Sequence, residues 1–271
     1  MKVVILCGGL GTRIRGVSDD IPKPMIPVGN LPILWHIMQH YAAFGHKDFI
    51  LCLGYKGNVI RDFFLNHEAH TKDFTICLGK SSTITYHNRD TMLNWNVTLA
   101  ETGENTMTGA RIAKIKKYIG SDPTFMLTYG DGLGNIDLHA LLRFHQAHQK
   151  IMTITGVKPP GRFGELKINA QQMITGFNEK PQATAGCISG GFFVCQREIF
   201  NYLNDDENLM FEEAPIKTLV ALRQAAAYQH DGFWQPMDTY RDYLYLNTLI
   251  KKGEMPWDVM MVSDTRAKEF Y

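Results

Sequence analysis

The sequence predicts an α/β fold, with a Rossmann-like, mostly parallel or mixed sheet flanked by helices and a smaller β-rich part. Through the first half, apolar strand-like runs alternate with helical patterns, which is typical of a parallel sheet covered on both faces. From about Lys158 onward, short strand-like runs are separated by turns. We therefore expect one domain over 1–271, with halves of about 1–157 and 158–257 and a loosely ordered tail over 258–271.

The elements of the first half are predicted from their hydrophobic patterns. Continuous apolar runs predict strands at 2–7, 49–53, 125–129 and 152–155, and shorter runs predict strands at 74–78 and 96–99. Apolar residues at helical spacing predict helices at 33–44, 59–65, 108–118 and 138–145. Thr108 is placed to cap the third helix, and Gly45 and Gly120 are placed to end the first and the third.

The second half contains fewer regular patterns. Short apolar runs predict strands at 166–168 and 192–195. Apolar residues at helical spacing predict a final helix over 240–250, which Gly253 is placed to end.

The charges of the chain almost cancel, with 28 basic and 27 acidic residues. A general binder of nucleic acid or of an anionic membrane needs a basic excess, so we expect neither partner. The sequence shows no signal-peptide pattern and no apolar run of bilayer length, and its five cysteines lack metal-ligand spacing. We therefore expect a cytoplasmic protein with free thiols.

The most informative segment is 6–13, Leu6-Cys7-Gly8-Gly9-Leu10-Gly11-Thr12-Arg13, at the exit of the first strand. Glycines there let backbone N–H groups approach a ligand and form an anion-binding concavity. Arg13 adds a planar guanidinium suited to phosphate oxygens, and Lys23 adds a point charge between two prolines. The spacing fits neither a Walker A loop nor a dinucleotide fingerprint. The segment therefore predicts a polyphosphate site, with a tight turn that binds no ligand as the alternative.

Asp131 is expected at the same edge of the sheet as the glycine segment. It follows the predicted strand 125–129, just as the glycines follow the strand 2–7. In open α/β sheets, ligands bind outside the carboxyl ends of the strands. Topology alone therefore predicts that a phosphate-binding loop and a carboxylate meet in one crevice.

Segment 6–13, together with Lys23-Pro24-Met25, resembles the signature of the sugar-1-phosphate nucleotidyltransferase family, and the resemblance covers about 1–257. Two later segments resemble the cytidylyl branch of that family: Met107-Thr108-Gly109-Ala110-Arg111 and Phe233-Trp234-Gln235-Pro236-Met237-Asp238-Thr239. Shorter matches are Tyr129-Gly130-Asp131-Gly132, Pro159-Pro160-Gly161-Arg162 and Glu179-Lys180-Pro181.

The resemblance implies an enzyme that transfers a cytidylyl group from CTP to a sugar 1-phosphate, with α-D-glucose 1-phosphate as the expected acceptor and pyrophosphate as the leaving group. It also implies Mg²⁺ as the cofactor, a homo-oligomer, a nucleotide-binding first half and a sugar-binding second half. Such a product would serve polysaccharide biosynthesis. The alternatives are the same reaction with another sugar phosphate or with UTP or dTTP, and a non-catalytic, nucleotide-binding regulatory subunit.

The resemblance assigns roles to residues motif by motif. Arg13 and Lys23 are the expected catalytic residues, and Asp131 and Asp238 are expected to hold the metal. Nucleotide binding is expected of Leu6, Cys7, Gly8, Gly9, Leu10, Gly11, Thr12, Arg13, Lys23, Thr106, Arg111 and Gly130. Sugar-phosphate binding is expected of Glu179, Lys180 and Gly191.

Some of these residues have a plainer interpretation. Asp238 could be the N-cap of the final helix, Asp131 could form a turn, and Lys180 and Arg111 could be solvated charges.

Three positions depart from the family pattern. The chain has Ser189 where the family usually has Asn, Phe211 where it has Trp, and Phe163 where it has Tyr. These changes alter polar contacts near the expected sugar. The sequence therefore determines the identity of the sugar less well than it determines the transfer of a cytidylyl group.

Overall fold

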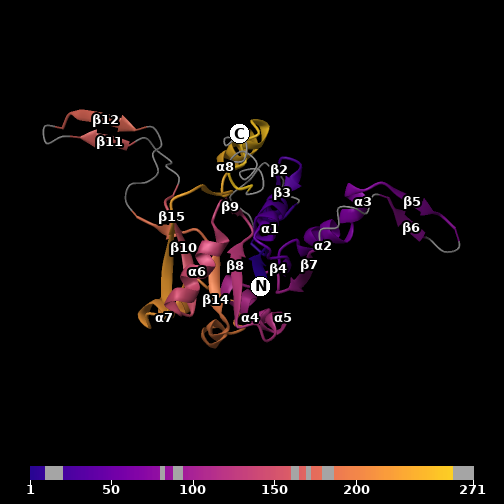
Figure 1. The fold of residues 1–271 in the computed structure, drawn as a ribbon, viewed down its shortest axis with the longest axis horizontal. Helices are drawn as coiled ribbons and strands as arrows, with labels where there is room; N and C mark the ends of the chain where they lie inside the picture. The colour runs from indigo at the N-terminus through magenta and orange to yellow at the C-terminus, as the bar shows by residue number, and fades with distance from the viewer. Residues whose placement is uncertain are drawn as a thin grey trace, which may run out of the picture.

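The computed structural model describes residues 1–9, 21–79, 83–87, 94–159, 165–168, 172–178 and 186–258. The strands of its central sheet are β1 Lys2–Leu6, β4 Asp48–Leu53, β7 Asn96–Glu101, β8 Thr124–Tyr129, β10 Met152–Val157, β13 Ile188–Ser189, β14 Phe193–Gln196 and β15 Ala225–His230. They follow one another in the order β13-β10-β14-β8-β1-β4-β7, and β15 pairs with β10 (Figure 1).

The central sheet is mixed, with a parallel region on one side. β1 pairs in parallel with both β4 and β8, and β4 pairs in parallel with β7. β14 lies antiparallel between β8 and β10, and β15 runs parallel to β10. The predicted mixed α/β sheet is therefore confirmed, and the carboxyl ends of β1, β4 and β8 meet at one edge.

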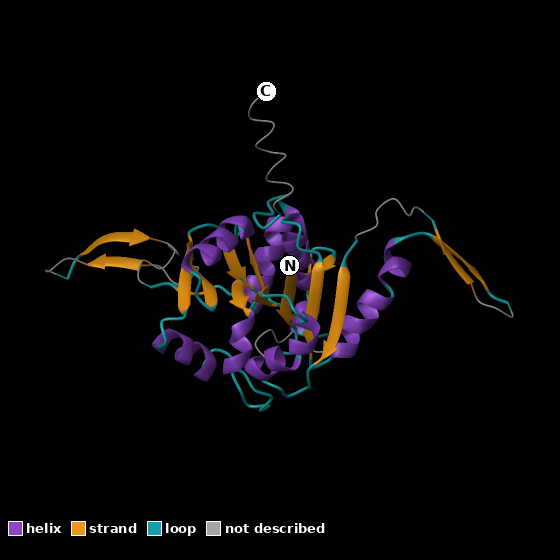
Figure 2. Ribbon diagram, turned by 60° about the horizontal axis from the view of Figure 1, so that its bottom comes forward, coloured by secondary structure: helices purple, strands orange, loops and turns teal. Residues whose placement is uncertain are grey.

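Helices cover both faces of this sheet (Figure 2). The α-helices are α1 Ile33–Ala43, α2 Gly57–Leu65, α3 His67–Thr71, α4 Thr108–Lys114, α5 Lys116–Ile119, α6 Leu138–His148, α7 Ala214–Ala221 and α8 Tyr240–Lys251. In the described part of the chain, 3₁₀ segments occur at η1 Lys23–Met25 and η2 Arg197–Tyr202. None of the described helices is long and apolar enough to cross a membrane.

The alternation of side chains along β1 explains why the protein has two apolar clusters. Val3 and Ile5 face a cluster that α1, α6 and α8 complete, whereas Val4 and Leu6 face one that α4, α5 and α7 complete. All four side chains are buried. A strand buried on both faces is apolar throughout, which is why the run 2–7 is readable as a central strand.

Among the described residues, four short antiparallel pairs lie outside the central sheet. Their strands are β2 Pro27–Val28 with β3 Leu31–Pro32, β5 Phe74–Cys77 with β6 Thr83–Tyr86, β9 Gly132–Gly134 with β16 Trp234–Pro236, and β11 Glu165–Ile168 with β12 Ile174–Asn178. The hairpins β5–β6 and β11–β12 project from opposite sides of the molecule (Figures 1 and 2). The strand expected at 74–78 therefore exists, but it belongs to a projecting hairpin.

The helix expected over 108–118 is divided, and its expected cap is wrong. Ile115 separates α4 from α5, and Met107 occupies the N-cap position of α4. The Thr108 hydroxyl instead donates to Glu212 Oε2 at 2.6 Å and accepts from the backbone N–H of Phe211 at 2.9 Å. A tertiary contact thus replaces the local cap. Of the expected tail, residues 259–271 lie outside the described part of the chain.

A candidate nucleotide site at the carboxyl edge of the sheet

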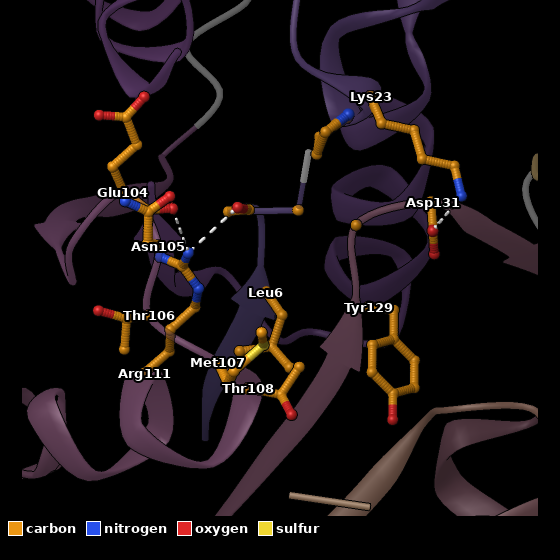
Figure 3. A pocket seen from close by; sticks show the side chains of 14 residues that line it. Leu6, Lys23, Glu104, Asn105, Thr106, Met107, Thr108, Arg111, Tyr129 and Asp131 are labelled. Atoms are coloured by element: carbon orange, nitrogen blue, oxygen red, sulfur yellow. Dashed lines mark hydrogen bonds and ion pairs between the residues drawn. The ribbon is translucent and has the colours of Figure 1, made fainter. Parts of the chain in front are cut away.

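A cavity of about 360 Å³ opens where β1 and β8 end, and this size suits a small-molecule ligand. Residues from two walls line it (Figure 3). One wall, which we call the loop wall, consists of Gly8, Gly9, the segment 104–108 and Arg111. The other, the charged wall, contains Lys23, Tyr129, Gly130 and Asp131, and Lys23 pairs with Asp238 as well.

Two glycines are required where backbone and side chains approach closely. A Cβ atom on Gly8 would lie 2.2 Å from the Arg111 guanidinium carbon, and one on Gly130 would lie 2.9 Å from the Leu6 carbonyl oxygen. The Gly130 N–H donates to that same carbonyl at 3.0 Å. The predicted meeting of the glycine segment with the end of β8 is therefore present for Gly8, Gly9 and Gly130. Leu10, Gly11, Thr12 and Arg13 lie outside the described residues.

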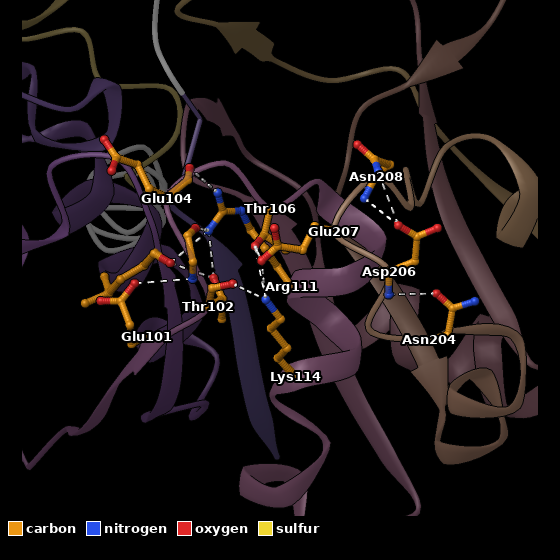
Figure 4. Close-up of polar contacts among 12 residues, drawn as sticks. Glu101, Thr102, Glu104, Thr106, Arg111, Lys114, Asn204, Asp206, Glu207 and Asn208 are labelled. Atoms are coloured by element: carbon orange, nitrogen blue, oxygen red, sulfur yellow. Dashed lines mark hydrogen bonds and ion pairs between the residues drawn. The ribbon is translucent and has the colours of Figure 1, made fainter.

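The Arg111 guanidinium holds the loop wall together. It donates to five oxygens at 2.7 to 3.1 Å: the carbonyls of Gly8, Leu53, Gly103 and Glu104 and the hydroxyl of Thr102. Figure 4 shows Arg111 with Thr102 and Glu104. Arg111 is 4% exposed, so the interpretation as a solvated charge is wrong. Burial lowers its pKa from the usual value. The bonds to carbonyl oxygens offset the cost of that burial. Direct contact with a nucleotide stays a prediction.

A second polar cluster supports the segment that carries Thr106. Lys114 Nζ donates to Thr106 Oγ1 at 3.1 Å and to the Thr102 carbonyl at 3.0 Å (Figure 4). The backbone N–H of Met107 donates to the Glu207 carbonyl at 2.8 Å. Thr106 is buried and lines the cavity, and its expected contact with a nucleotide stays a prediction. Segment 104–108 is thus held from below by α4 and from the side by the second half of the chain.

The charged wall contains one ammonium group between two carboxylates. Lys23 Nζ lies 2.5 Å from Asp131 Oδ2 and 2.6 Å from Asp238 Oδ1. The Lys23 side chain is 13% exposed. Burial lowers its pKa, but attraction to Asp131 and the hydrogen bonds to both carboxylates outweigh burial, so the pKa of Lys23 is raised overall. Lys23 is therefore protonated near neutral pH.

The three charged groups come from distant parts of the chain. Lys23 begins η1, Asp131 follows β8, and Asp238 follows β16. Antiparallel pairing of β16 with β9, and a hydrogen bond from the Met237 N–H to the Asp131 carbonyl at 2.8 Å, place Asp238 beside Asp131. Thr239 caps α8, so Asp238 does not cap this helix.

The sequence did not reveal the role of Glu212. Its carboxylate accepts from the Tyr129 hydroxyl at 2.5 Å and from the Thr108 hydroxyl at 2.6 Å. Burial, followed by the charge of Glu212, raises the pKa of Tyr129 above its usual range. Glu212 thus connects the two walls of the cavity from the second half of the chain. In the sequence, the only indication of this role is that Glu212 follows Phe211, which stands where the family usually has Trp.

The structure describes some of the residues that we expect near the sugar. Gly191 has a φ of +75°, and a Cβ there would lie 3.1 Å from the Tyr129 ring, so Gly191 lies against the charged wall. Ser189 is exposed, and Ser189 Oγ lies 3.5 Å from the Gly191 N–H. Glu179, Lys180 and Phe163 lie outside the described residues.

Cys7 lies between residues that line the cavity but is not among them, and its expected contact with a nucleotide stays a prediction. Its side chain is fully buried, and burial raises the pKa of its thiol well above the usual value. The Cys7 N–H donates to the Cys52 carbonyl at 3.0 Å, which continues the pairing of β1 with β4 beyond Leu6. The thiol is thus unsuited to react as a nucleophile.

Comparison with known proteins identifies relatives that match nearly the whole chain. The chain is 45% identical to a glucose-1-phosphate cytidylyltransferase from Salmonella typhimurium, covering 95% of this chain and 98% of that protein. It is 44% identical to a probable glucose-1-phosphate cytidylyltransferase from Bacillus subtilis, covering 96% of this chain and all of the relative.

Solved structures also share the fold. HddC from Yersinia pseudotuberculosis is 25% identical, with a TM-score of 0.64 over 92% of this chain and 99% of that one. A UDP-glucose pyrophosphorylase complexed with UDP-glucose is 17% identical with a TM-score of 0.66, over 93% of this chain and 98% of that one, which supports the fold alone. The nucleotidyl transferase family matches residues 2–253, so the chain belongs to the nucleotidyl transferase family.

Proposed function

We propose that the protein transfers a cytidylyl group from CTP to a sugar 1-phosphate, with α-D-glucose 1-phosphate as the acceptor and pyrophosphate as the second product. The observation that carries this proposal is the cluster of Lys23, Asp131 and Asp238 beside the glycine loop. The identity of 45% to a glucose-1-phosphate cytidylyltransferase, over nearly the full length of both chains, supports the choice of base and sugar.

The reaction needs positioning and charge neutralisation more than covalent help from the protein. An oxygen of the sugar phosphate attacks the α-phosphorus of CTP, a new P–O bond forms, and the bond to the leaving pyrophosphate breaks. The nucleophile is already an anion, so no general base is required. Lys23 is protonated, partly buried and on the cavity wall, and it would neutralise charge that develops at the α-phosphate. We also assign Arg13 to the β- and γ-phosphates.

The two carboxylates of the charged wall fit a Mg²⁺ ion. Asp131 and Asp238 each place one oxygen within 2.6 Å of the same ammonium nitrogen, so both can share a single cation. Among the described residues there is no group of three or more metal-ligating side chains. The two carboxylates of Asp131 and Asp238 suit Mg²⁺, which commonly binds one or two carboxylates together with waters and substrate phosphates. Bound there, Mg²⁺ would supply Lewis-acid stabilisation of phosphate oxygens.

The remaining assignments follow the two walls. We propose that segment 104–108 and Arg111 receive the nucleoside and that the N–H groups of the glycine segment receive its phosphates. Gly191, with Glu179 and Lys180, would receive the sugar phosphate on the Tyr129 side. The first half thus binds the nucleotide, and the second half binds the sugar.

The test is an assay of pyrophosphate release over a grid of CTP, UTP, dTTP and GTP against several sugar 1-phosphates. We expect the highest kcat/KM with CTP and glucose 1-phosphate. A preference for UTP or dTTP would contradict the cytidylyl assignment, and a preference for another sugar would correct the acceptor. Turnover by no pair, together with tight CTP binding, would favour a regulatory subunit instead.

We also propose that the protein is a homo-oligomer whose contacts include the β5–β6 hairpin. Phe74, Ile76 and Ile84 are 41 to 50% exposed on this hairpin, and every residue of β5 is exposed. An isolated two-stranded hairpin is marginally stable in water, so a second copy of the chain is its expected cover. Ile76→Lys should lower the mass measured by light scattering, whereas Ile174→Lys on the opposite hairpin serves as the comparison. An unchanged mass would contradict the assignment.

All five cysteines are free, and three of them are buried. Free thiols are what a reducing compartment maintains, and we propose that the protein acts in the cytoplasm.

A further inference from the structure

Asp242, on the first turn of α8, contacts the segment that carries Asp238 at several points. Its Oδ2 accepts from the backbone N–H of Asp238 at 3.1 Å and from that of Thr239 at 2.8 Å. Oδ2 also accepts from the Thr239 hydroxyl at 2.8 Å. An ordinary capping box needs only the reciprocal pair between Thr239 and Asp242. The bond to Asp238 lies outside that motif.

The second oxygen of Asp242 fixes the other end of the same segment. Oδ1 accepts from Gln235 Nε2 at 3.0 Å, and Gln235 Nε2 also donates to the Pro236 carbonyl at 2.9 Å. Gln235 is 5% exposed, so this amide is a buried brace. One carboxylate therefore holds the segment 235–239 at both of its ends.

Asp238, which pairs with Lys23 in the charged wall, lies within this segment directly after Met237. Met237 is fully buried, and its N–H bonds the Asp131 carbonyl, which fixes the middle of the segment to the end of β8. Asp242 accepts from the Asp238 N–H and so restrains the backbone from which the Asp238 side chain projects. Groups behind a cation-binding residue commonly fix the orientation of that residue, and here the support acts on the Asp238 backbone.

We propose that Asp242 is a positioning residue for nucleotidyl transfer, acting through Asp238 and not through contact with substrate. This inference rests on the proposed function, because it concerns the same cation-binding carboxylate. Asp242 keeps Asp238 Oδ1 directed toward Lys23 and Asp131, where a metal ion would bind. Asp242, a capping-box residue of α8, thereby orients a carboxylate of the site, although its own side chain does not enter the site.

The chain contains a matched control for the capping function. Asp137 is the N-cap of α6 and accepts from the Ala140 N–H at 2.9 Å, and it is not among the residues that line the cavity. Asp137→Ala and Asp242→Ala should both lower the melting temperature by a few degrees. Only Asp242→Ala should lower kcat, by about 10- to 100-fold, with a smaller change in the KM for CTP. Equal kcat values for the two variants would overturn the proposal.

A double-mutant cycle separates action through Asp238 from a general loss of structure. In the Asp238→Ala background, Asp242→Ala should cause no further loss of kcat, because its route to the site is already gone. A further loss as large as in the native background would overturn the proposal. If Asp242→Ala fails to fold, Asp242→Asn serves instead. Its amide oxygen can still accept from the Asp238 N–H, so it should fold and recover most of kcat, and a loss as large as that of Asp238→Ala would contradict positioning.

A binding measurement gives a readout besides turnover. Electron paramagnetic resonance of Mn²⁺ in the presence of CTP should show binding that is about 10- to 100-fold weaker for Asp242→Ala than for Asp137→Ala. Equal affinity would count against the proposal. A wild-type protein that neither binds CTP nor turns it over would instead refute the proposed function, so the two failures are distinguishable.

Discussion

The two walls of the cavity are organised by different interactions (Figure 3). In the loop wall, one buried guanidinium donates to five oxygens of the protein itself, four of them backbone carbonyls. In the charged wall, the Lys23 ammonium bridges two carboxylates that come from distant segments. The loop wall thus has a shape that is fixed before any ligand arrives. The charged wall is held by ion pairs that a triphosphate and a cation would rearrange.

This difference suggests a division of labour. Release of Arg111 would remove a donor from the buried Gly8 carbonyl and from the partly buried carbonyls of Gly103 and Glu104, so the loop wall provides shape. An ammonium shared by two carboxylates can exchange one partner for a phosphate, so the charged wall provides reactivity. Mutations in the first wall should therefore affect stability and affinity together, and those in the second should affect turnover most.

The largest expected effect is that of Lys23→Met in the charged wall. Without the ammonium, charge at the α-phosphate is not neutralised, so kcat should fall by about 10²- to 10³-fold. Without substrate, the same variant should bind Mn²⁺ more tightly than the native protein, because no ammonium competes for Asp131 and Asp238. Calorimetric titration tests the second effect. Weaker Mn²⁺ binding would show that the two carboxylates do not share a cation.

Arg111→Lys should produce the largest loss of stability. A lysine cannot reproduce the planar guanidinium donors, so the buried Gly8 carbonyl and the partly buried carbonyls of Gly103 and Glu104 lose a donor, and unfolding should become easier by about 3 kcal/mol. Urea denaturation measures this loss, and the KM for CTP should rise with it. Arg143→Lys, at an exposed position of α6, is the control. Comparable losses from both variants would show that the loop wall does not depend on the guanidinium.

Gly8→Ala, compared with Gly9→Ala, tests how closely Arg111 packs against the glycine segment of the loop wall. Its methyl group would lie 2.2 Å from the buried guanidinium, whereas a Cβ on Gly9 would meet nothing within 4 Å. Overpacking at Gly8 should cost about 2 to 3 kcal/mol of unfolding free energy, and Gly9→Ala should cost far less. Similar midpoints of denaturation for the two variants would contradict the close approach of Arg111 to the glycine loop.

The smallest effect concerns the scaffold behind both walls. Burial lowers the pKa of His145 to about 4, and that of His40 to about 4 as well. Unfolded histidines protonate near pH 6.5. Each residue therefore contributes its full stability above pH 6.5 and loses it as the pH falls toward 4, by about 2 kcal/mol near pH 5.

Denaturation by urea near neutral pH and near pH 5 measures this loss. His145→Gln should reduce the pH dependence, whereas His70→Gln, at an exposed position, should leave it unchanged. A dependence that His145→Gln does not alter would assign the acid sensitivity to other groups.

The sequence predicted the local elements and the place of the site but not its long-range connections. The apolar run 2–7 and the position of Asp131 after 125–129 are local features, and they suffice to place the glycine segment and Asp131 at one sheet edge. The antiparallel insertion of β14 and the β9–β16 pairing depend on residues distant in sequence. For the same reason the local sequence predicts Thr108 as a helix cap, whereas its actual partner, Glu212, comes from the second half of the chain.

The position of a triphosphate in a crystal of the protein grown with a non-hydrolysable CTP analogue tests the central claim most directly. The account predicts that its phosphates contact the N–H groups of the glycine segment and Lys23 Nζ, with the cytosine against segment 104–108. An analogue bound away from Lys23 and Asp131, with the cavity between the two walls left to solvent, would contradict it.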